Sequence, residues 1–165
     1  MVQLTILVTD TNIWIDLVNG EILEMIFGLP FTFMIPDIAE SEFSRQPKWD
    51  LLLKLGVVPG ELNGYQVADL INITQVNQSL SSNDVAAFIL ARDLATVLLT
   101  GDKHLRKMAS DHGVQVHGLL WLMDELVGFG ILDKNTAFDS LLRIMSQNSR
   151  LPQSECQERL KRWSP

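Results

Sequence analysis

Five short, largely apolar runs, each followed by a stretch long enough for a helix, limit what this chain can fold into more than any other feature. Apolar strands that alternate with helices are typical of a parallel sheet with helices on both of its faces. The sequence therefore predicts a three-layer α/β/α fold. The predicted strands cover residues 4–9, 31–35, 55–58, 97–100 and 114–117.

The stretches between these runs carry helical patterns. The helix expected over residues 81–94 is apolar nearly all round, so we expect it to be buried. Pro36 is favoured in the first turn of a helix, and Pro59 is expected to end the third strand. No element is predicted for residues 60–79. Further helices are predicted over residues 37–44, 103–112, 119–129, 134–148 and 153–162.

The length and composition are those of a compact protein without a membrane segment. The 165 residues suit one domain, or one domain with a small helical appendage, and 47% of them are hydrophobic. The longest apolar runs, such as residues 85–91, are too short to span a bilayer. The first basic residue is Arg45, so the start lacks the basic flank of a signal peptide. One cysteine, Cys156, excludes an intramolecular disulfide framework and a thiolate metal site. We therefore expect a cytoplasmic protein.

The charges are divided unevenly along the chain. Residues 1–102 hold thirteen Asp and Glu against four Lys and Arg, whereas residues 103–165 hold seven against nine. A net charge of −7 argues against tight non-specific binding of nucleic acid but is compatible with a nuclease, which must release its product. Three basic residues of one predicted helix either contact phosphates or form a solvated helix face: Lys103, Arg106 and Lys107.

Three carboxylates stand where strands end or helices begin. Asp10 directly follows the first strand, where a helix is expected to start, and Asp102 follows the fourth. Ligands of open parallel sheets bind beyond the carboxyl ends of the strands. Asp84 lies in the first turn of the buried helix. Each acid also has a structural alternative, because Asp10 and Asp102 could cap helices and residues 81–84 have the spacing of a capping box.

Glu42 adds a fourth carboxylate. In an α-helix over residues 37–44, a rotation of about 100° per residue places Glu42 roughly 40° from Ile38, on the inward edge. Glu40 lies about 200° from Ile38 and is expected to face water. Burying an unpaired carboxylate is costly, so Glu42 needs either a salt bridge or a metal ion, and the nearby segment offers few basic residues.

The combination of these acids predicts a metal site. Three or four carboxylates that converge without an interleaved Lys or Arg repel one another unless a cation lies between them. Hard oxygen ligands with room for water select Mg²⁺ or Mn²⁺. Such ions activate a water molecule and stabilise the charge that develops on a phosphodiester. The sequence therefore predicts metal-dependent hydrolysis of a phosphodiester bond.

Five segments of the chain, in this order and spacing, resemble PIN-domain proteins. The resemblance covers roughly residues 4–130 and rests on the series more than on any single motif. The segments are residues 8–12 (VTDTN), Pro36 followed six residues later by Glu42, residues 80–86 (LSSNDVA), residues 98–102 (LLTGD) and residues 114–118 (VQVHG).

This resemblance implies a five-stranded parallel sheet of order 3-2-1-4-5, with acids at one end. It also implies a metal-dependent endoribonuclease, often the toxin of a VapC-like toxin–antitoxin pair. The possible partners are then an antitoxin protein and a second copy of the chain in a homodimer. The family's catalytic, metal-binding quartet falls on Asp10, Glu42, Asp84 and Asp102, with Glu40 competing for the place of Glu42. Supporting polar positions fall on Asn12 and Thr100.

The resemblance also divides the chain. Residues 1–130 are expected to form the PIN-like nuclease domain, and residues 131–165 a C-terminal helical extension packed on the same domain. The last helix, over residues 153–162, serves either as an interface or as a solvated tail.

Two other function classes stay open. One is a phosphatase with Asp10 as covalent nucleophile. Asn12 stands where such enzymes carry a second Asp, which removes the general acid and disfavours that hypothesis. The other is a catalytically silent PIN-like module that binds nucleic acid or protein, which the intact acids argue against.

Histidines and tryptophans add little to the functional hypotheses. The histidine spacing is not that of a zinc site, so these residues are expected at the surface or at strand ends, with His104 near enough to Asp102 to approach a substrate. Tryptophans are expected in packing more than in base stacking. The residues concerned are His104, His112, His117, Trp14, Trp49, Trp121 and Trp163.

Overall fold

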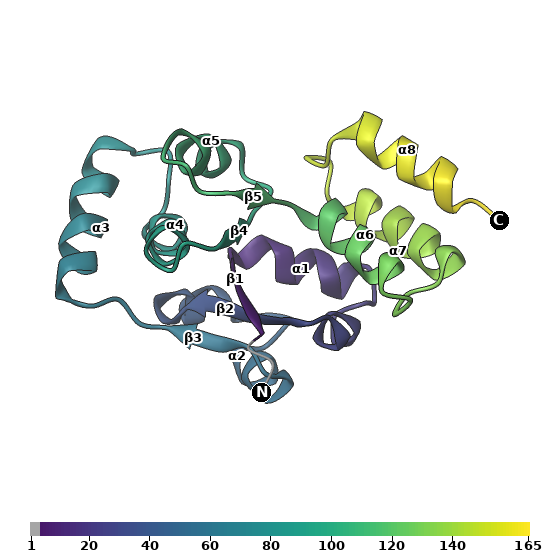
Figure 1. Ribbon diagram of the computed structural model, residues 1–165, viewed down its shortest axis with the longest axis horizontal. Coiled ribbons are helices and arrows are strands. Elements are labelled where there is room, and N and C mark those ends of the chain that lie inside the picture. Colours follow the sequence, from purple (N-terminus) through teal and green to yellow (C-terminus); the bar gives the residue numbers. More distant parts are fainter. Residues whose placement is uncertain (1–3) are drawn as a thin grey trace.

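The computed structural model describes residues 4–165 and contains one five-stranded sheet (Figure 1). The strand order is β3-β2-β1-β4-β5 and all four pairs of neighbours are parallel. Both the α/β class and the strand order expected from the sequence are thereby confirmed. The strands are β1 (Thr5–Thr9), β2 (Phe31–Pro36), β3 (Val58–Gly60), β4 (Val97–Leu99) and β5 (Val116–His117).

Alternate residues of the central strands contribute to two separate apolar cores, because successive side chains of a strand point to opposite faces of the sheet. Leu7 and Leu99 join the larger core, which holds α1, α6, α7 and α8, whereas Val8 and Leu98 join the smaller core with α4 and α5. The helices are α1 (Thr11–Asn19), α2 (Trp49–Leu55), α3 (Gly64–Val76), α4 (Ser82–Asp93), α5 (Lys103–Asp111), α6 (Leu119–Gly128), α7 (Lys134–Gln147) and α8 (Gln153–Trp163), with 3₁₀ helices η1 (Glu24–Gly28) and η2 (Asp37–Glu42).

The prediction for the third strand was wrong by several residues. The segment before it forms α2, which ends at Gly56 in the left-handed conformation with φ of 111°. The strand itself contains Pro59, which was expected to end it, and pairs in register with Met34–Pro36 of β2. Proline is tolerated because β3 lies at the edge of the sheet, where one side of the strand needs no backbone donor.

The helix after β2 also differs from the expectation. Residues 37–42 form a 3₁₀ helix, and Pro36 is the last residue of β2 instead of part of a helical turn. With about three residues per turn, Glu42 aligns with Ala39, which is buried, and not with Ile38, which is 41% exposed. The α-helical rotation that placed Glu42 beside Ile38 was therefore wrong.

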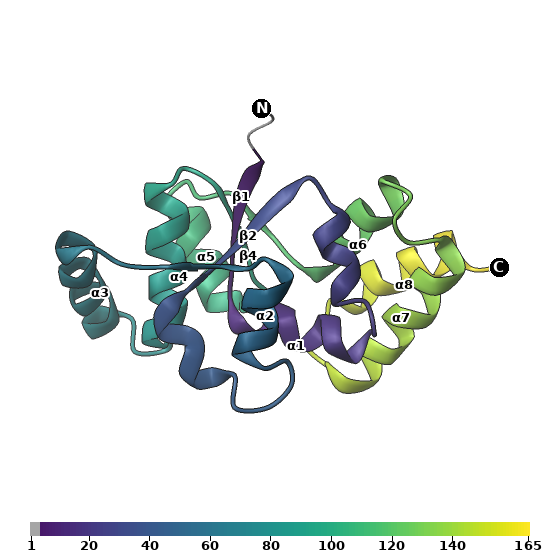
Figure 2. The ribbon, with the colours of Figure 1, turned by 90° about the horizontal axis from the view of Figure 1, so that it is seen from below.

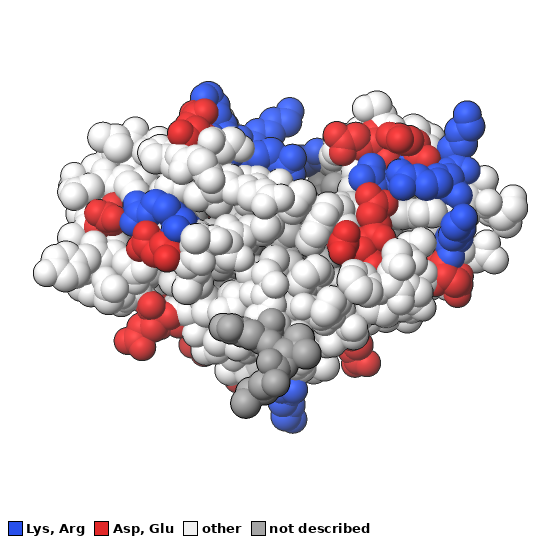
Figure 3. Space-filling model, in the orientation of Figure 1, with Lys and Arg blue, Asp and Glu red and all other residues white. Residues whose placement is uncertain are grey.

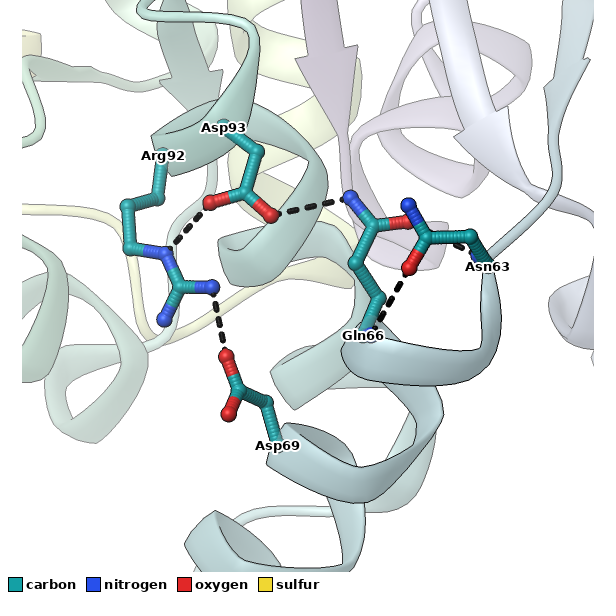
Figure 4. A network of polar contacts seen from close by, with 5 residues as sticks. All are labelled: Asn63, Gln66, Asp69, Arg92 and Asp93. Carbon is teal, nitrogen blue, oxygen red and sulfur yellow. Dashed lines mark hydrogen bonds and ion pairs between the residues drawn. The ribbon is translucent and has the colours of Figure 1, made fainter.

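Residues 60–79, for which the sequence predicted no element, hold α3. Its capping box joins Asn63 and Gln66, a local signal that the sequence offered. None of the residues of α3 is buried, although Leu70 and Ile73 pack half-buried against the smaller core. Figure 4 shows the polar bonds that also hold it: Gln66 and Asp69 bond to Asp93 and Arg92 at the end of α4.

The two ends of the molecule are occupied by α3 and by the C-terminal helices (Figures 1 and 2). Within α8, Cys156, Leu160 and Trp163 are buried in the larger core, together with residues of α1 and α7. Arg159 of α8 donates to both carboxylate oxygens of Asp124 in α6. A domain boundary at residue 130 stays a prediction.

Tryptophans are used in packing, as the sequence suggested. Trp14 and Trp163 are almost fully buried, and Trp49 and Trp121 are half-buried against the larger core. Over residues 4–165, no helix is long and apolar enough to cross a membrane. Residues 1–3, part of the start that argued against a signal peptide, lie outside the described residues.

Candidate active site

Asp10 is a buried carboxylate at the end of the central strand. Its side chain is 5% exposed and accepts a hydrogen bond from the backbone N–H of Ile13 at 3.3 Å, which caps α1. Thr100 donates its hydroxyl to the other carboxylate oxygen. Burial raises the pKa of Asp10 from 3.8 to about 7, although these two hydrogen bonds lower it, and nearby Asp84 and Asp102 raise it further.

The pairing of β1 with β4 explains why Asp10 meets Thr100. The register matches Thr9 with Leu99, so the residues that follow each of them emerge side by side. Thr100 is fully buried and its hydroxyl has two partners, because it also accepts the backbone N–H of Asp102 at 3.1 Å. Thr100 therefore connects the two acids that follow β1 and β4.

Asp102 is half-buried at the start of α5. Its side chain accepts the backbone N–H of Leu105 at 2.9 Å and caps the helix. The capping alternative considered for this residue is thus realised, as it is for Asp10. Both acids nevertheless lie close enough for Asp102 to raise the pKa of Asp10.

Asp84 likewise combines a capping role with proximity to Asp10. Its carboxylate accepts the backbone N–H and the hydroxyl of Ser81 at 2.9 Å and 2.8 Å, and its own N–H donates to the Ser81 hydroxyl at 3.1 Å. The capping box inferred from residues 81–84 is therefore present. Asp84 also raises the pKa of Asp10 and lines the same narrow pocket.

Glu42 lies at the rim of this region and is exposed. Its carboxylate accepts a hydrogen bond from the side-chain amide of Asn83, the residue before Asp84. Glu40 lines a separate, open depression with Ile38 and Phe43. The structure therefore places Glu42, and not Glu40, beside α4. Asn83 was not singled out from the sequence, although it lies within the segment that carried the resemblance.

A narrow pocket joins the ends of β1 and β2 to η2 and α4. The hydroxyl of Thr9, which lines this pocket, accepts the indole N–H of Trp14 at 2.7 Å. Asn12, expected to support the acids, is exposed in the first turn of α1. The pocket is lined by Thr9, Asp10, Thr11, Ile35, Pro36, Ala39, Asn83 and Asp84.

The donor set fits a hard divalent cation, because it consists of carboxylate, hydroxyl and amide oxygens. The ion pairs found in residues 4–165 all involve other carboxylates. Within these residues, no ion pair with Lys or Arg neutralises Asp10, Asp84 or Asp102. Within residues 4–165, no group of three or more His, Cys, Asp or Glu side chains is already spaced to coordinate a metal ion directly. Asp10, Asp84 and Asp102 instead each occupy a helix-capping position.

The basic residues of α5 have different surroundings. Lys107 pairs with Asp111 at 2.7 Å, Lys103 is exposed, and Arg106 donates to the backbone carbonyl of Thr100 at 3.1 Å. Figure 3 shows basic side chains gathered over the position of α5.

The three histidines lie at the surface or at a strand end, as expected. His104 is exposed in the first turn of α5, and His112 contacts the carbonyl of Met108 at 2.8 Å. His117 ends β5 and stacks on Trp121, with ring centroids 4.4 Å apart.

Comparisons with known proteins place this sequence in a family. The DUF3368 family model, described as a PIN domain, matches residues 6–165. A solved PilT N-terminus domain protein from the hyperthermophilic archaeon Sulfolobus solfataricus is 16% identical, with a TM-score of 0.48 over 74% of this chain and 94% of that chain. No curated protein sequence matches the chain.

Proposed function

The chain belongs to the PIN-domain family, and on that premise we propose that it is an endoribonuclease that depends on Mg²⁺ or Mn²⁺. PIN domains have a nuclease fold in general and commonly use divalent metals. The single observation that carries the proposal for this chain is the environment of Asp10. A carboxylate with a pKa of about 7, with two further acids near it and no basic partner among residues 4–165, favours a bound cation.

Asp10, Asp84 and Asp102 would hold the ion, with Glu42 at the rim. A bound divalent ion supplies an activated water and stabilises charge on the phosphodiester. Thr100 fixes one oxygen of Asp10 and the backbone of Asp102, so it orients two of the acids. Burial of Asp10 keeps its carboxylate partly protonated near neutral pH, which makes ion binding release a proton.

We place the RNA over the start of α5, where Lys103 is exposed and can meet phosphates. Asn12 lies exposed in the first turn of α1 and can contact the same strand of RNA. As the toxin of a pair, the protein would form a homodimer and be silenced by an antitoxin that inserts a basic or aromatic side chain at the acids. A guanidinium suits that site because it pairs with two carboxylates at once.

Cleavage of single-stranded RNA by purified protein tests the proposal. We expect activity with Mn²⁺ or Mg²⁺, none with EDTA, and a loss of roughly a hundredfold or more in Asp10→Asn and in Asp102→Asn, because the ion is no longer positioned. Asp139→Asn is the matched control, since Asp139 is an exposed acid of α7 outside the site. Undiminished cleavage by either site variant would overturn the assignment, and RNA binding without cleavage would identify a binding module instead.

A further inference from the structure

Arg106 makes a contact within the protein that a residue serving only to bind RNA would not need. Its guanidinium Nη2 donates to the backbone carbonyl of Thr100 at 3.1 Å. Thr100 is the last residue before the Gly101–Asp102 segment that leads into α5, six positions before Arg106. The side chain therefore reaches back over the start of its own helix to the end of β4.

Gly118 provides the space for this contact. Its φ of −121° and ψ of −170° are extended values that any residue adopts, so the backbone does not require glycine. A Cβ at this position would lie 2.9 Å from Nη2 of Arg106 and 3.6 Å from the carbonyl oxygen of Thr100. The missing side chain is what lets the guanidinium lie against the β5–α6 junction.

Every polar atom of Thr100 has a hydrogen-bond partner. Its N–H donates to the carbonyl of His117 at 2.9 Å and its carbonyl accepts from Arg106. Its hydroxyl donates to Asp10 and accepts from the N–H of Asp102. Thr100 therefore links the guanidinium of Arg106, through its carbonyl, to the two acids that its hydroxyl contacts.

We propose that Arg106, seated against Gly118, is a positioning residue that fixes Thr100 and thereby sets Asp10 and Asp102 for binding a shared divalent ion. This inference rests on the proposed function, because it assigns the two acids to one ion. It differs from the role that the sequence suggested for Arg106, a direct contact to RNA phosphate.

The two roles predict opposite changes in metal affinity. A guanidinium near carboxylates repels a metal cation. The electrostatic effect alone of removing the Arg106 guanidinium would therefore strengthen Mn²⁺ binding. If Arg106 positions Thr100, its removal weakens Mn²⁺ binding in spite of that electrostatic gain. A phosphate contact instead leaves metal affinity unchanged or higher and raises only the KM for RNA.

Calorimetric titration of the RNA-free protein with Mn²⁺ separates these roles. We expect Gly118→Ala, which displaces the guanidinium but keeps its charge, and Arg106→Gln to weaken Mn²⁺ binding by roughly tenfold each. The double variant is expected to lose no more than either single variant, because both changes act on one contact. Lys107→Gln, on the same helix but paired with Asp111, is the control and is expected to bind like the wild type.

Amide hydrogen exchange gives a readout that needs no metal. Loosening of Thr100 should speed exchange of the Asp102 amide in Gly118→Ala and in Arg106→Gln but not in Lys107→Gln. Unchanged or tighter Mn²⁺ binding by Gly118→Ala and Arg106→Gln, with unchanged exchange at Asp102, overturns the positioning role. A wild-type protein that binds no Mn²⁺ overturns the proposed function and, with it, the shared ion.

Discussion

At the contact between α3 and α4, Arg92 lies between two carboxylates, whereas at the ends of β1 and β4 the carboxylates have only hydroxyl and amide partners. Arg92 donates to Asp69 at 2.8 Å and to Asp93 at 2.7 Å (Figure 4). Asp10, by contrast, is bonded by Thr100 and Ile13.

The pKa values of the two acidic groups move in opposite directions. The hydrogen bond from Arg92 lowers the pKa of Asp93, while burial raises the pKa of Asp10 to about 7. At the α3–α4 contact the chain supplies its own cation, so that group of acids stabilises the fold. At the strand ends the charge has no counterpart in residues 4–165, which costs stability and leaves a place for an ion from outside.

The largest effect on stability is expected from Asp10→Asn. The folded protein holds a proton on Asp10 up to about pH 7, whereas the unfolded chain loses it near pH 3.8, so this group's contribution is complete below pH 3.8 and is lost as pH rises through 7. We therefore expect the metal-free variant to be more stable than the wild type at pH 8, by up to a few kcal/mol, and to lose that advantage at pH 4. Urea unfolding at both pH values measures this.

The control is Asp93→Asn, for which the sign reverses. Because the folded pKa of Asp93 is lowered, its contribution is present at neutral pH and is lost as pH falls through the folded pKa. Destabilisation by Asp93→Asn should thus be larger at pH 8 than at low pH. Equal responses of the two variants to pH would contradict the opposite pKa shifts of Asp10 and Asp93.

Arg92→Gln should have an intermediate effect. The change leaves Asp69 and Asp93 without their cation and removes a guanidinium that lies 5.6 Å from the centre of the Phe88 ring. Since the side chain is 32% exposed, we expect a loss of only about 1 kcal/mol, with no change in Mn²⁺ binding. A fall in metal affinity in this variant would show that the two acidic groups are coupled.

Asp84→Asn should change stability least, because two effects oppose each other. The substitution weakens the capping box with Ser81 but relieves the repulsion that Asp84 exerts on ionised Asp10. At pH 5, where Asp10 is protonated, only the capping loss of roughly 0.5 kcal/mol should remain. At pH 8 the two should nearly cancel, while the rise in melting temperature caused by Mn²⁺ shrinks. A capping role alone requires equal losses at both pH values and an unchanged Mn²⁺ effect.

Features that depend on neighbours in the sequence were predicted well. The positions of Asp10 and Asp102 after strands, where each caps a helix, were predicted because each follows an apolar run. The capping box at Ser81 and Asp84 was predicted because its partners are three residues apart. The strand order came with the family resemblance. These features need no knowledge of the packed structure beyond the rule that ligands gather at the carboxyl ends of parallel strands.

Features set by tertiary contacts were missed. Residues 37–42 have a helical pattern, but they form a 3₁₀ helix with Ala39 buried, and the choice of 3₁₀ over α-helix decides which residues Glu42 aligns with. Helix α3 packs Leu70 and Ile73 against the smaller core and is also held by polar bonds to Arg92 and Asp93, which no apolar periodicity reveals. The space at Gly118 has meaning only once Arg106 lies against it.

The bond from Thr100 to Asp10 joins residues that are 90 positions apart in the chain. Closing so long a loop is slow and entropically costly, and it is repaid only when β4 pairs with β1. A folding chain that has made only its first strands and helices holds Asp10 but not the partner that orients it. The acids are therefore brought together by the same cooperative step that pairs β4 with β1. A partly folded chain contains the acidic residues of the site but does not hold them close together.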